Sequence, residues 1–189
     1  MSLALIADLK NRLSLPDATD DALLQRFLDW ASAAAEGYCN RAFAYVASDT
    51  YIFSADRCSV VLPRYPVVNI SLIETQQNSL AAWATQSVDY TLRQASGILD
   101  LQSQLGTRTQ LARITYSGGY VLPGNTPGVG QTALPGDLEN SIIEQAAAWY
   151  VQRNSLRYVD GDTVSTQPYG LTFLPQVRNT WDGLKRIIL

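Results

Sequence analysis

The spacing of apolar residues changes twice along this chain of 189 residues, and this change limits the folds that it can adopt. Residues 1–40 and 137–189 repeat apolar side chains every three or four positions, which is the period of an amphipathic helix. Residues 41–120 instead carry short β-branched and aromatic runs between turn residues, as strands do. The order predicts a β region inserted between two helical segments.

Two helices are predicted in residues 1–40. The first carries four apolar side chains on one side: Leu5, Ile6, Leu9 and Leu13. Ser2 is placed to cap this helix, and Pro16 ends it, because the residue before a proline avoids the helical conformation. The second helix follows the acidic stretch that ends at Asp21, and it ends near Asn40. Its apolar stripe is wide enough to face a core: Leu23, Phe27, Trp30, Ala34 and Tyr38.

Six strands are predicted from the β-branched and aromatic runs: residues 50–53, 59–62, 67–73, 89–92, 97–101 and 113–117. Prolines, glycines and one polar stretch separate them, and no helical pattern lies between. Strands at this spacing predict an antiparallel meander or a small barrel.

Two long loops are predicted, residues 121–136 and 155–174, on either side of a third helix at about 137–154. The first loop is uncharged and holds three prolines and four glycines. Structureless connections longer than about 12–15 residues are uncommon and often functional.

The third helix has an apolar face made of Leu138, Ile142, Ala146, Trp149 and Tyr150. A fourth helix opens at Pro175, a residue suited to the first helical position, and its stripe is Val177, Trp181, Leu184 and Ile188. We expect Trp30, Trp149 and Trp181 to lie in the core.

The predicted fold is therefore α+β, a small helical bundle of two N-terminal and two C-terminal helices with an inserted antiparallel β meander or small barrel. We expect residues 1–189 to form a single domain.

The chain has no histidine, and its 14 basic and 17 acidic side chains give a formal net charge of −3. Without imidazole, a Ser-His or Cys-His nucleophile pair and a two-histidine zinc site are excluded. The negative charge argues against a basic patch for nucleic acid. We expect no catalytic residue, no cofactor and no metal, and hence no enzyme.

The two cysteines, Cys39 and Cys58, are too few for a disulfide scaffold, and both lie in apolar surroundings. We expect two buried thiols, with an oxidisable pair as the alternative. No apolar run approaches the roughly 18 residues of a membrane span, and the N-terminus lacks the basic region of a signal peptide. A protein made in the cytosol without membrane contact is expected.

Three motifs in the sequence have residue types that can carry chemistry. Residues 128–133 match G-x-G-x-x-A, but prolines occupy the place of the strand that a dinucleotide site requires, so a loop is favoured. Asp89 and Asp100 lie on neighbouring predicted strands, and glycoside hydrolysis needs two acids. Asp160 and Asp162 resemble a fragment of a calcium loop without its closing glutamate. Solvated acids in turns explain these carboxylates more simply.

Several stretches of the chain, each weak alone, share a characteristic order and spacing: residues 20–24, 33–41, 62–67, 114–120, 134–138 and 146–153. In that order they resemble the head–tail connector (adaptor) proteins of long-tailed bacteriophages and prophages. The resemblance spans nearly the whole chain.

The resemblance implies a structural virion protein that forms a ring, commonly of twelve copies, beneath the portal protein. The next neck or tail protein would dock on the other side, and DNA would pass through the channel without specific binding. The protein would be found at the head–tail junction of the virion, and in the host bacterial cytoplasm during assembly. An acidic subunit fits this role, because a negative lumen repels phosphate.

The two long loops are expected to contact other subunits or the portal protein. The residues expected to make these contacts are Tyr120, Val121, Leu122, Val129, Arg157, Tyr158, Tyr169, Leu171 and Phe173. Two alternatives stay open: a carbohydrate-binding or carbohydrate-cleaving module that uses acids of the β region, and a tail-completion or tape-associated protein of the same particles.

Overall fold

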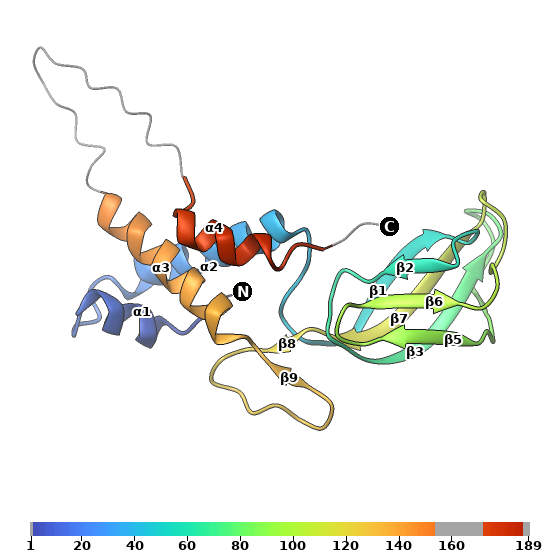
Figure 1. The fold of residues 1–189 in the computed structure, drawn as a ribbon, viewed down its shortest axis with the longest axis horizontal. Helices are drawn as coiled ribbons and strands as arrows, with labels where there is room; N and C mark the ends of the chain where they lie inside the picture. The colour runs from blue at the N-terminus through green and yellow to red at the C-terminus, as the bar shows by residue number, and fades with distance from the viewer. Residues whose placement is uncertain (1, 154–171, 187–189) are drawn as a thin grey trace, which may run out of the picture. The chain divides into compact units, whose positions relative to one another are not determined.

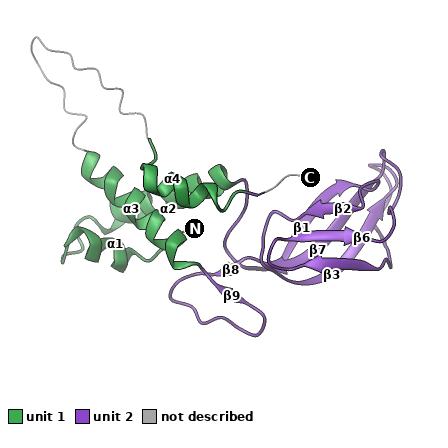
Figure 2. Ribbon diagram, viewed as in Figure 1, with its two compact units in different colours: residues 1–39, 135–185 green, residues 40–134, 186–189 purple. Residues whose placement is uncertain are grey.

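The computed structural model describes residues 2–153 and 172–186, and the chain divides into two compact units (Figure 1, Figure 2). The helical unit comprises residues 1–39 and 135–185, and the β unit comprises residues 40–134 and 186–189. This division confirms the α+β class and the insertion of a β region between helical segments. That the two units act as a single connector domain stays a prediction.

The helical unit contains α1 (Ile6–Leu13), α2 (Asp21–Cys39), α3 (Gly136–Gln152) and α4 (Pro175–Asp182). The third helix is central, because α1, α2 and α4 all pack against it (Figure 1). Its predicted apolar face is confirmed as buried: Leu138, Ile142, Ala146, Trp149 and Tyr150. The start of α4 at Pro175 is also as predicted.

Trp181 on α4 has no exposed surface, which confirms its predicted place in the core. Its indole Nε1 donates a hydrogen bond of 2.9 Å to the Ser141 hydroxyl on α3. A buried indole N–H needs such an acceptor, since an unmade hydrogen bond in the core is costly. Val177, one turn earlier, is buried as well. These contacts dock α4 onto α3.

The predicted helix cap at Ser2 is wrong. The first helix begins after Leu5, which has no side-chain cap bond, while the Ser2 hydroxyl donates to the Ala4 carbonyl at 2.7 Å. The reason is a tertiary contact: the backbone N–H of buried Leu3 donates to the Ser32 hydroxyl on α2 at 3.0 Å. The chain lies along α2 before α1 can start.

The buried face of α2 is offset by one position from the predicted stripe. Its buried side chains are Leu24, Leu28, Ala31, Ser32, Ala35 and Cys39. The prediction that Trp30 lies in the core is wrong, because its side chain is 49% exposed. The face of α2 that carries Leu24, Leu28 and Ala31 is buried in the helical unit instead.

The β unit contains nine strands in its described residues: β1 (Val46–Ser54), β2 (Ser59–Val61), β3 (Val67–Gln76), β4 (Ala84–Thr85), β5 (Tyr90–Arg93), β6 (Ile98–Leu101), β7 (Leu111–Gly118), β8 (Tyr120–Val121) and β9 (Thr132–Ala133). All six predicted strands are present. The two-residue strands β4, β8 and β9 were not predicted.

Two antiparallel sheets make up most of the β unit, in the orders β1-β7-β3-β4 and β2-β6-β5. A parallel pair, β8-β9, stands apart from them. The late strand β7 lies between β1 and β3, so the centre of the larger sheet joins segments far apart in the sequence (Figure 1).

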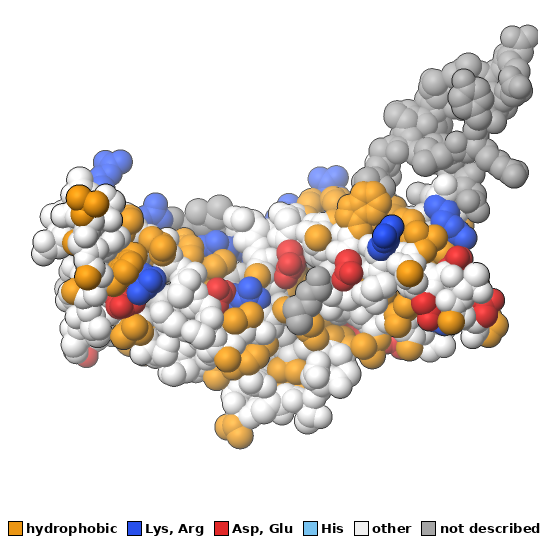
Figure 3. All heavy atoms as spheres, turned by 180° about the vertical axis from the view of Figure 1, so that it is seen from behind, with side chains coloured by type: hydrophobic (Ala, Val, Ile, Leu, Met, Phe, Trp, Pro, Cys, Tyr) orange, Lys and Arg blue, Asp and Glu red, His pale blue; other side chains and the backbone are white. Residues whose placement is uncertain are grey.

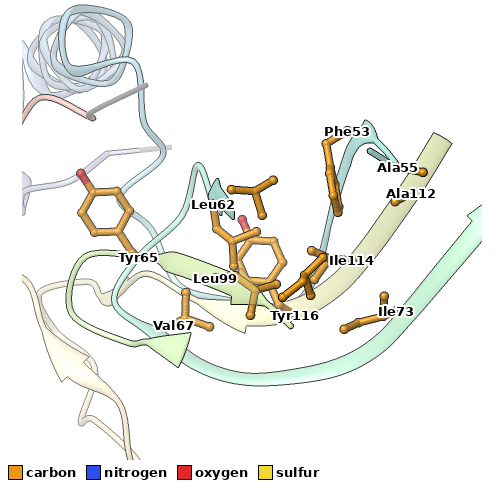
Figure 4. Packing of buried hydrophobic residues seen from close by; sticks show 12 residues of the cluster. Phe53, Ala55, Leu62, Tyr65, Val67, Ile73, Leu99, Ala112, Ile114 and Tyr116 are labelled. Atoms are coloured by element: carbon orange, nitrogen blue, oxygen red, sulfur yellow. The ribbon is translucent and has the colours of Figure 1, made fainter. Parts of the chain in front are cut away.

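The core of the β unit is built from inward-facing residues of both sheets (Figure 4). Strand β7 alternates strictly, with Ala112, Ile114 and Tyr116 buried and the residues between them turned outward. Leu99 on β6 and Leu62 beyond β2 complete the same cluster. The alternation of inward and outward side chains, which predicted strands here, therefore also places the side chains that fill this core.

The two cysteines differ in environment. Cys39 is buried at the end of α2, as predicted, but Cys58 is exposed, so the prediction of two buried thiols is wrong. Cys58 sits before β2, where the buried run starts only at Val60. Neither cysteine takes part in a disulfide.

Candidate assembly surfaces

Seven aromatic side chains gather in the helical unit, and we call them the aromatic cluster: Phe27, Trp30, Tyr38, Trp149, Tyr150, Phe173 and Trp181. The ring of Phe173 lies 4.9 Å from that of Trp181 and 6.4 Å from that of Trp149. At the other side, Trp30 lies 5.3 Å from Trp149. The cluster joins three helices, and Trp30 is its exposed end.

Trp30 lies in a stripe of exposed residues along the outer face of α2, which we call the α2 stripe: Ala22, Arg26, Trp30, Ala33 and Gly37. Their spacing of three or four places them on one face. Three of the five are alanine or glycine, so another surface can come close to the helix there. An exposed tryptophan amid small residues is typical of a contact hot spot.

A shallow groove with a volume of about 270 Å³ lies over α3, and we call it the α3 groove. Its apolar lining is Leu13, Ala147, Ala148, Val151 and Leu174. Val151 is 66% exposed. At one rim, Arg12 donates two hydrogen bonds to Glu144, of 2.6 and 3.1 Å. The groove is smaller than the roughly 300–1,000 Å³ typical of small-molecule sites, so it suits a single side chain better than a cofactor.

A separate hollow of about 490 Å³ lies beside this groove toward the start of α3, and carboxylates line it. Asp8 and Glu139 line it together with Glu144, and Arg12 is the basic residue among them. Burial, and then the nearby Asp8, raise the pKa of Glu139 above its ordinary value. The rim is therefore acidic, with a carboxylate pair that an approaching cation would stabilise.

The first long loop projects from the β unit between β8 and β9. Strand β8 pairs in parallel with β9 through Tyr120 with Thr132 and Val121 with Ala133 (Figure 1). The intervening residues are largely exposed, and Val129 is fully exposed. This region is not structureless, since its two ends are paired and only the segment between them extends into solvent.

The base of this loop is fixed by close backbone contacts. Gly119 has a φ of +100°, and a Cβ there would come within 2.6 Å of the Ala44 carbonyl oxygen, so glycine is required. The next N–H, of Tyr120, donates to the Phe43 carbonyl at 2.7 Å. The guanidinium of buried Arg41 lies 3.4 Å from the centre of the Tyr65 ring and 5.6 Å from that of Tyr120.

The outer face of the larger sheet carries a mixed row of side chains. The strand register aligns Ile52, Arg113 and Glu74 across β1, β7 and β3. Arg113 pairs with Glu74 at 2.6 Å, and its guanidinium lies 4.4 Å from the centre of the Trp83 ring. Ile52 is 52% exposed. Trp83, which the sequence did not place in the core, therefore covers an ion pair.

A charged pair lies beside the point where Asp49 on β1 faces Tyr116 on β7. The Arg64 guanidinium lies 2.8 Å from Asp49, and the Tyr116 hydroxyl is 3.4 Å from the same carboxylate. Burial raises the pKa of Tyr116, and the Asp49 charge adds to the rise. Tyr116 therefore stays protonated near neutral pH and can donate a hydrogen bond to Asp49.

Asp100, one of the two acids considered for sugar chemistry, is engaged in local contacts. The strand register places Asp100 opposite Thr91, so Asp89 is its diagonal neighbour on the same face. However, the Asp100 carboxylate accepts from the Ser59 hydroxyl at 2.6 Å and pairs with Arg93 at 3.1 Å. Both of its oxygens are therefore already bound.

The glycine motif of residues 128–133 does not precede a helix. The Gln131 side chain closes a turn by accepting from the Gly128 N–H at 2.8 Å, and β9 follows. The first helix after it starts only at Gly136. A pyrophosphate site needs the helix N-terminus directly after the glycines, so this motif is a turn.

The contact residues predicted from the sequence fall into three groups. Val129 is exposed at the loop tip, while Tyr120, Val121 and Leu122 are half-buried at its base. Phe173 belongs to the aromatic cluster of the helical unit. The others lie outside the described residues: Arg157, Tyr158, Tyr169 and Leu171, and with them Asp160 and Asp162.

Sequence reasoning missed the α3 groove and the exposure of Trp30. The groove combines α1, α3 and Leu174, three segments that no local pattern connects. The signal for Trp30 was present in the alternative stripe of Leu24, Leu28, Ala31 and Ala35, whose spacing is equally helical.

Basic side chains are scattered over the face seen in Figure 3 and do not gather in one patch. Within residues 2–153 and 172–186, no group of three or more His, Cys, Asp or Glu side chains is arranged to hold a metal ion. Among the same residues, no helix has both the length and the apolar character needed to span a bilayer.

A model of the head completion protein family matches residues 2–180 of this chain. No curated protein sequence matches it. Solved structures of other chains share its fold. One is from the neck of an empty GTA particle computed with C6 symmetry (20% identity, TM-score 0.63, covering 98% of this chain and 91% of that one).

The second is from the virion of a native gene transfer agent (GTA) particle, with 19% identity, a TM-score of 0.61 and coverage of 98% and 91%. The third is from the neck of a native GTA particle computed with C12 symmetry, with 19% identity, a TM-score of 0.59 and coverage of 97% and 89%. The similarity extends over both the helical and the β unit.

Proposed function

The chain belongs to the head completion protein family and is a structural head–tail connector protein, and from this premise we propose that it forms a ring between the portal and the neck or tail of a phage-like particle. The observation that carries the proposal is its likeness, over 97–98% of its length, to chains from particle necks computed with C6 and C12 symmetry. A ring of twelve copies is the form that we propose.

The proposed partners are further copies of this chain, the portal protein on one side and a downstream neck or tail-completion protein on the other. The exposed loop between β8 and β9 supports such contacts, because its fixed base lowers the entropy cost of binding. Its lack of charge suits a surface that is buried on assembly, since the cores of interfaces are depleted of charged residues. Assembly would take place in the host bacterial cytoplasm.

We propose that DNA passes through the ring without specific binding. The formal charge of −3 per copy is repeated around the channel, and like charges disfavour tight contact with phosphate. We propose a non-enzymatic role, which membership of a head completion family supports.

The experiment is to delete the gene from the genome that encodes the chain and to complement it with variants. Loss of the protein should leave DNA-filled heads and separate tails, and the wild-type chain should restore complete particles. A variant in which residues 124–130 are replaced by a short glycine-serine linker should fold but fail to complete particles. Full completion by that variant would contradict the role of the loop.

A matched control is Asp100→Asn, which tests the carbohydrate alternative at the same time. Because both Asp100 oxygens already bind Ser59 and Arg93, we expect this variant to complete particles as the wild type does. A loss of soluble glycan binding in Asp100→Asn, without a loss of assembly, would favour the alternative.

A further inference from the structure

Two exposed apolar features of the helical unit lie on opposite sides of α3. Trp149, which supports the Trp30 ring, and Val151, in the α3 groove, are two positions apart on this helix. At about 100° per residue, two positions place them about 200° apart around the axis. The Trp30 ring, which rests on Trp149, and the α3 groove therefore lie on different sides of α3.

A closed ring of identical copies requires this kind of arrangement. Head-to-tail contacts join two different patches of the same chain, and the patches must lie on separate sides of each copy. The α2 stripe offers a projecting aromatic ring, and the α3 groove offers a recess lined by small and aliphatic side chains. The features are thus a knob and a hole of opposite shape.

The charges beside the two features are complementary as well. On α2, exposed Arg26 lies one turn before Trp30, about 6 Å along the axis. On α3, Glu144 lies one turn before Ala148, at the same spacing. An arginine that approaches Glu144 would add a second guanidinium to the one that Arg12 already provides.

The ring of Trp30 is also prepared for binding. It rests on Trp149, at 5.3 Å between ring centres, and on Phe27, at 6.5 Å, so its orientation is set before contact. A side chain that is fixed in advance loses little conformational entropy when it docks. Tryptophan in a desolvated pocket is among the strongest contributors to protein interfaces.

We propose that Trp30 of one copy inserts into the α3 groove of the neighbouring copy, with Arg26 beside the acidic rim at Glu144. This contact rests on the proposed ring and identifies the surfaces that build it. The helical unit would then supply the ring contact, which leaves the loop between β8 and β9 for other partners.

The test places a photoreactive benzophenone amino acid at position 30 of the full chain and irradiates complete particles. The expected product is a cross-linked dimer of the chain, and peptide mapping should locate the attachment at Leu13, Ala148, Val151 or an adjacent residue. The matched control carries the same amino acid at Leu80, which is 96% exposed in the β unit. Position 80 should not cross-link to the groove.

Cross-links from position 30 to another protein, or to a different surface of a neighbouring copy, would contradict the proposed Trp30 contact. They would leave the proposed ring unaffected. The same holds if position 30 forms no cross-link in particles that contain the chain. If the chain is missing from complete particles, the proposed function itself fails. These results are distinguishable in one experiment, because the particle content is measured before irradiation.

A second measurement uses Val151→Glu, which adds a charge to the groove at a position that is already exposed. We expect the variant to keep the melting temperature of the wild type and to enter particles at least tenfold less. Leu80→Glu is the control and should enter particles normally. Wild-type incorporation of Val151→Glu would overturn the proposal.

Discussion

Trp181 and Trp30 differ in burial, so the alanine variants at these two positions should lose clearly different amounts of the free energy of unfolding. Trp181 is fully buried, and aromatic side chains of this kind bury about 150–250 Å². At about 25 cal/mol per Å², reduced for the compactness of the unfolded chain, the loss is about 3–5 kcal/mol. The cost of leaving the Ser141 hydroxyl unpaired adds to this loss.

Trp30→Ala should cost about half as much, roughly 1.5–2.5 kcal/mol, because half of the side chain is already exposed. The assay is urea denaturation of the purified protein followed by far-UV circular dichroism, which reports the helices. Leu80→Ala, at a fully exposed site, is the control and should change the free energy of unfolding by less than about 0.5 kcal/mol. Equal losses for Trp30→Ala and Trp181→Ala would refute the placement of the aromatic cluster.

Three further predictions concern single residues. Gly119→Ala should destabilise the β unit by about 2 kcal/mol or more, because of its φ of +100° and the close Ala44 carbonyl. Gly37→Ala is the control and should stabilise α2 by about 0.5–1 kcal/mol, because there is open space at its Cβ. An equal effect of both changes on the free energy of unfolding, measured by urea denaturation, would contradict this. Because the pKa of Glu139 is raised in the folded state, its charged form destabilises the fold at pH values above that pKa. This destabilisation disappears as the pH falls through the pKa. Glu139→Gln should therefore have a higher melting temperature than the wild type at pH 7, and the difference should vanish near pH 4. A constant difference in melting temperature across that range would exclude this cause. Glu74→Ala should cost about 3 kcal/mol in urea denaturation, because it leaves the half-buried Arg113 charge unpaired, and a loss below about 1 kcal/mol would contradict it.

The secondary structure could be predicted because the spacing of apolar residues is set by the same contacts that bury them. The alternation of Ala112, Ile114 and Tyr116 on β7 and the run from Leu138 to Tyr150 on α3 are examples. The two-residue strands β8 and β9 could not be predicted, since their pairing depends on how the ends of a long loop meet.

The order of the strands in the sheets could not be predicted from the sequence. Strand β7 pairs with both β1 and β3, although about sixty residues separate Thr50 from its partner Thr115. Nothing in a local pattern selects this pairing over a simple meander, because each strand presents the same alternation on its inner face.

Of the two exposed surfaces, the loop around Val129 could be predicted from the sequence and the exposed face of α2 could not. The exposure of Val129 and the turn at residues 128–131 follow from a proline- and glycine-rich composition. Trp30 could not be placed, because α2 has two adjacent apolar stripes and only packing against α3 decides which one is buried. The larger side chains suggested the wrong face.

The central claim is that this chain works as a ring at the head–tail junction. The most direct measurement is an electron cryomicroscopy reconstruction of the neck of complete particles from the encoding genome. We expect a closed ring of this chain below the portal, with the helical unit of each copy in contact with the next. A junction that lacks the chain, or holds it as isolated copies that do not touch, would contradict the proposed ring.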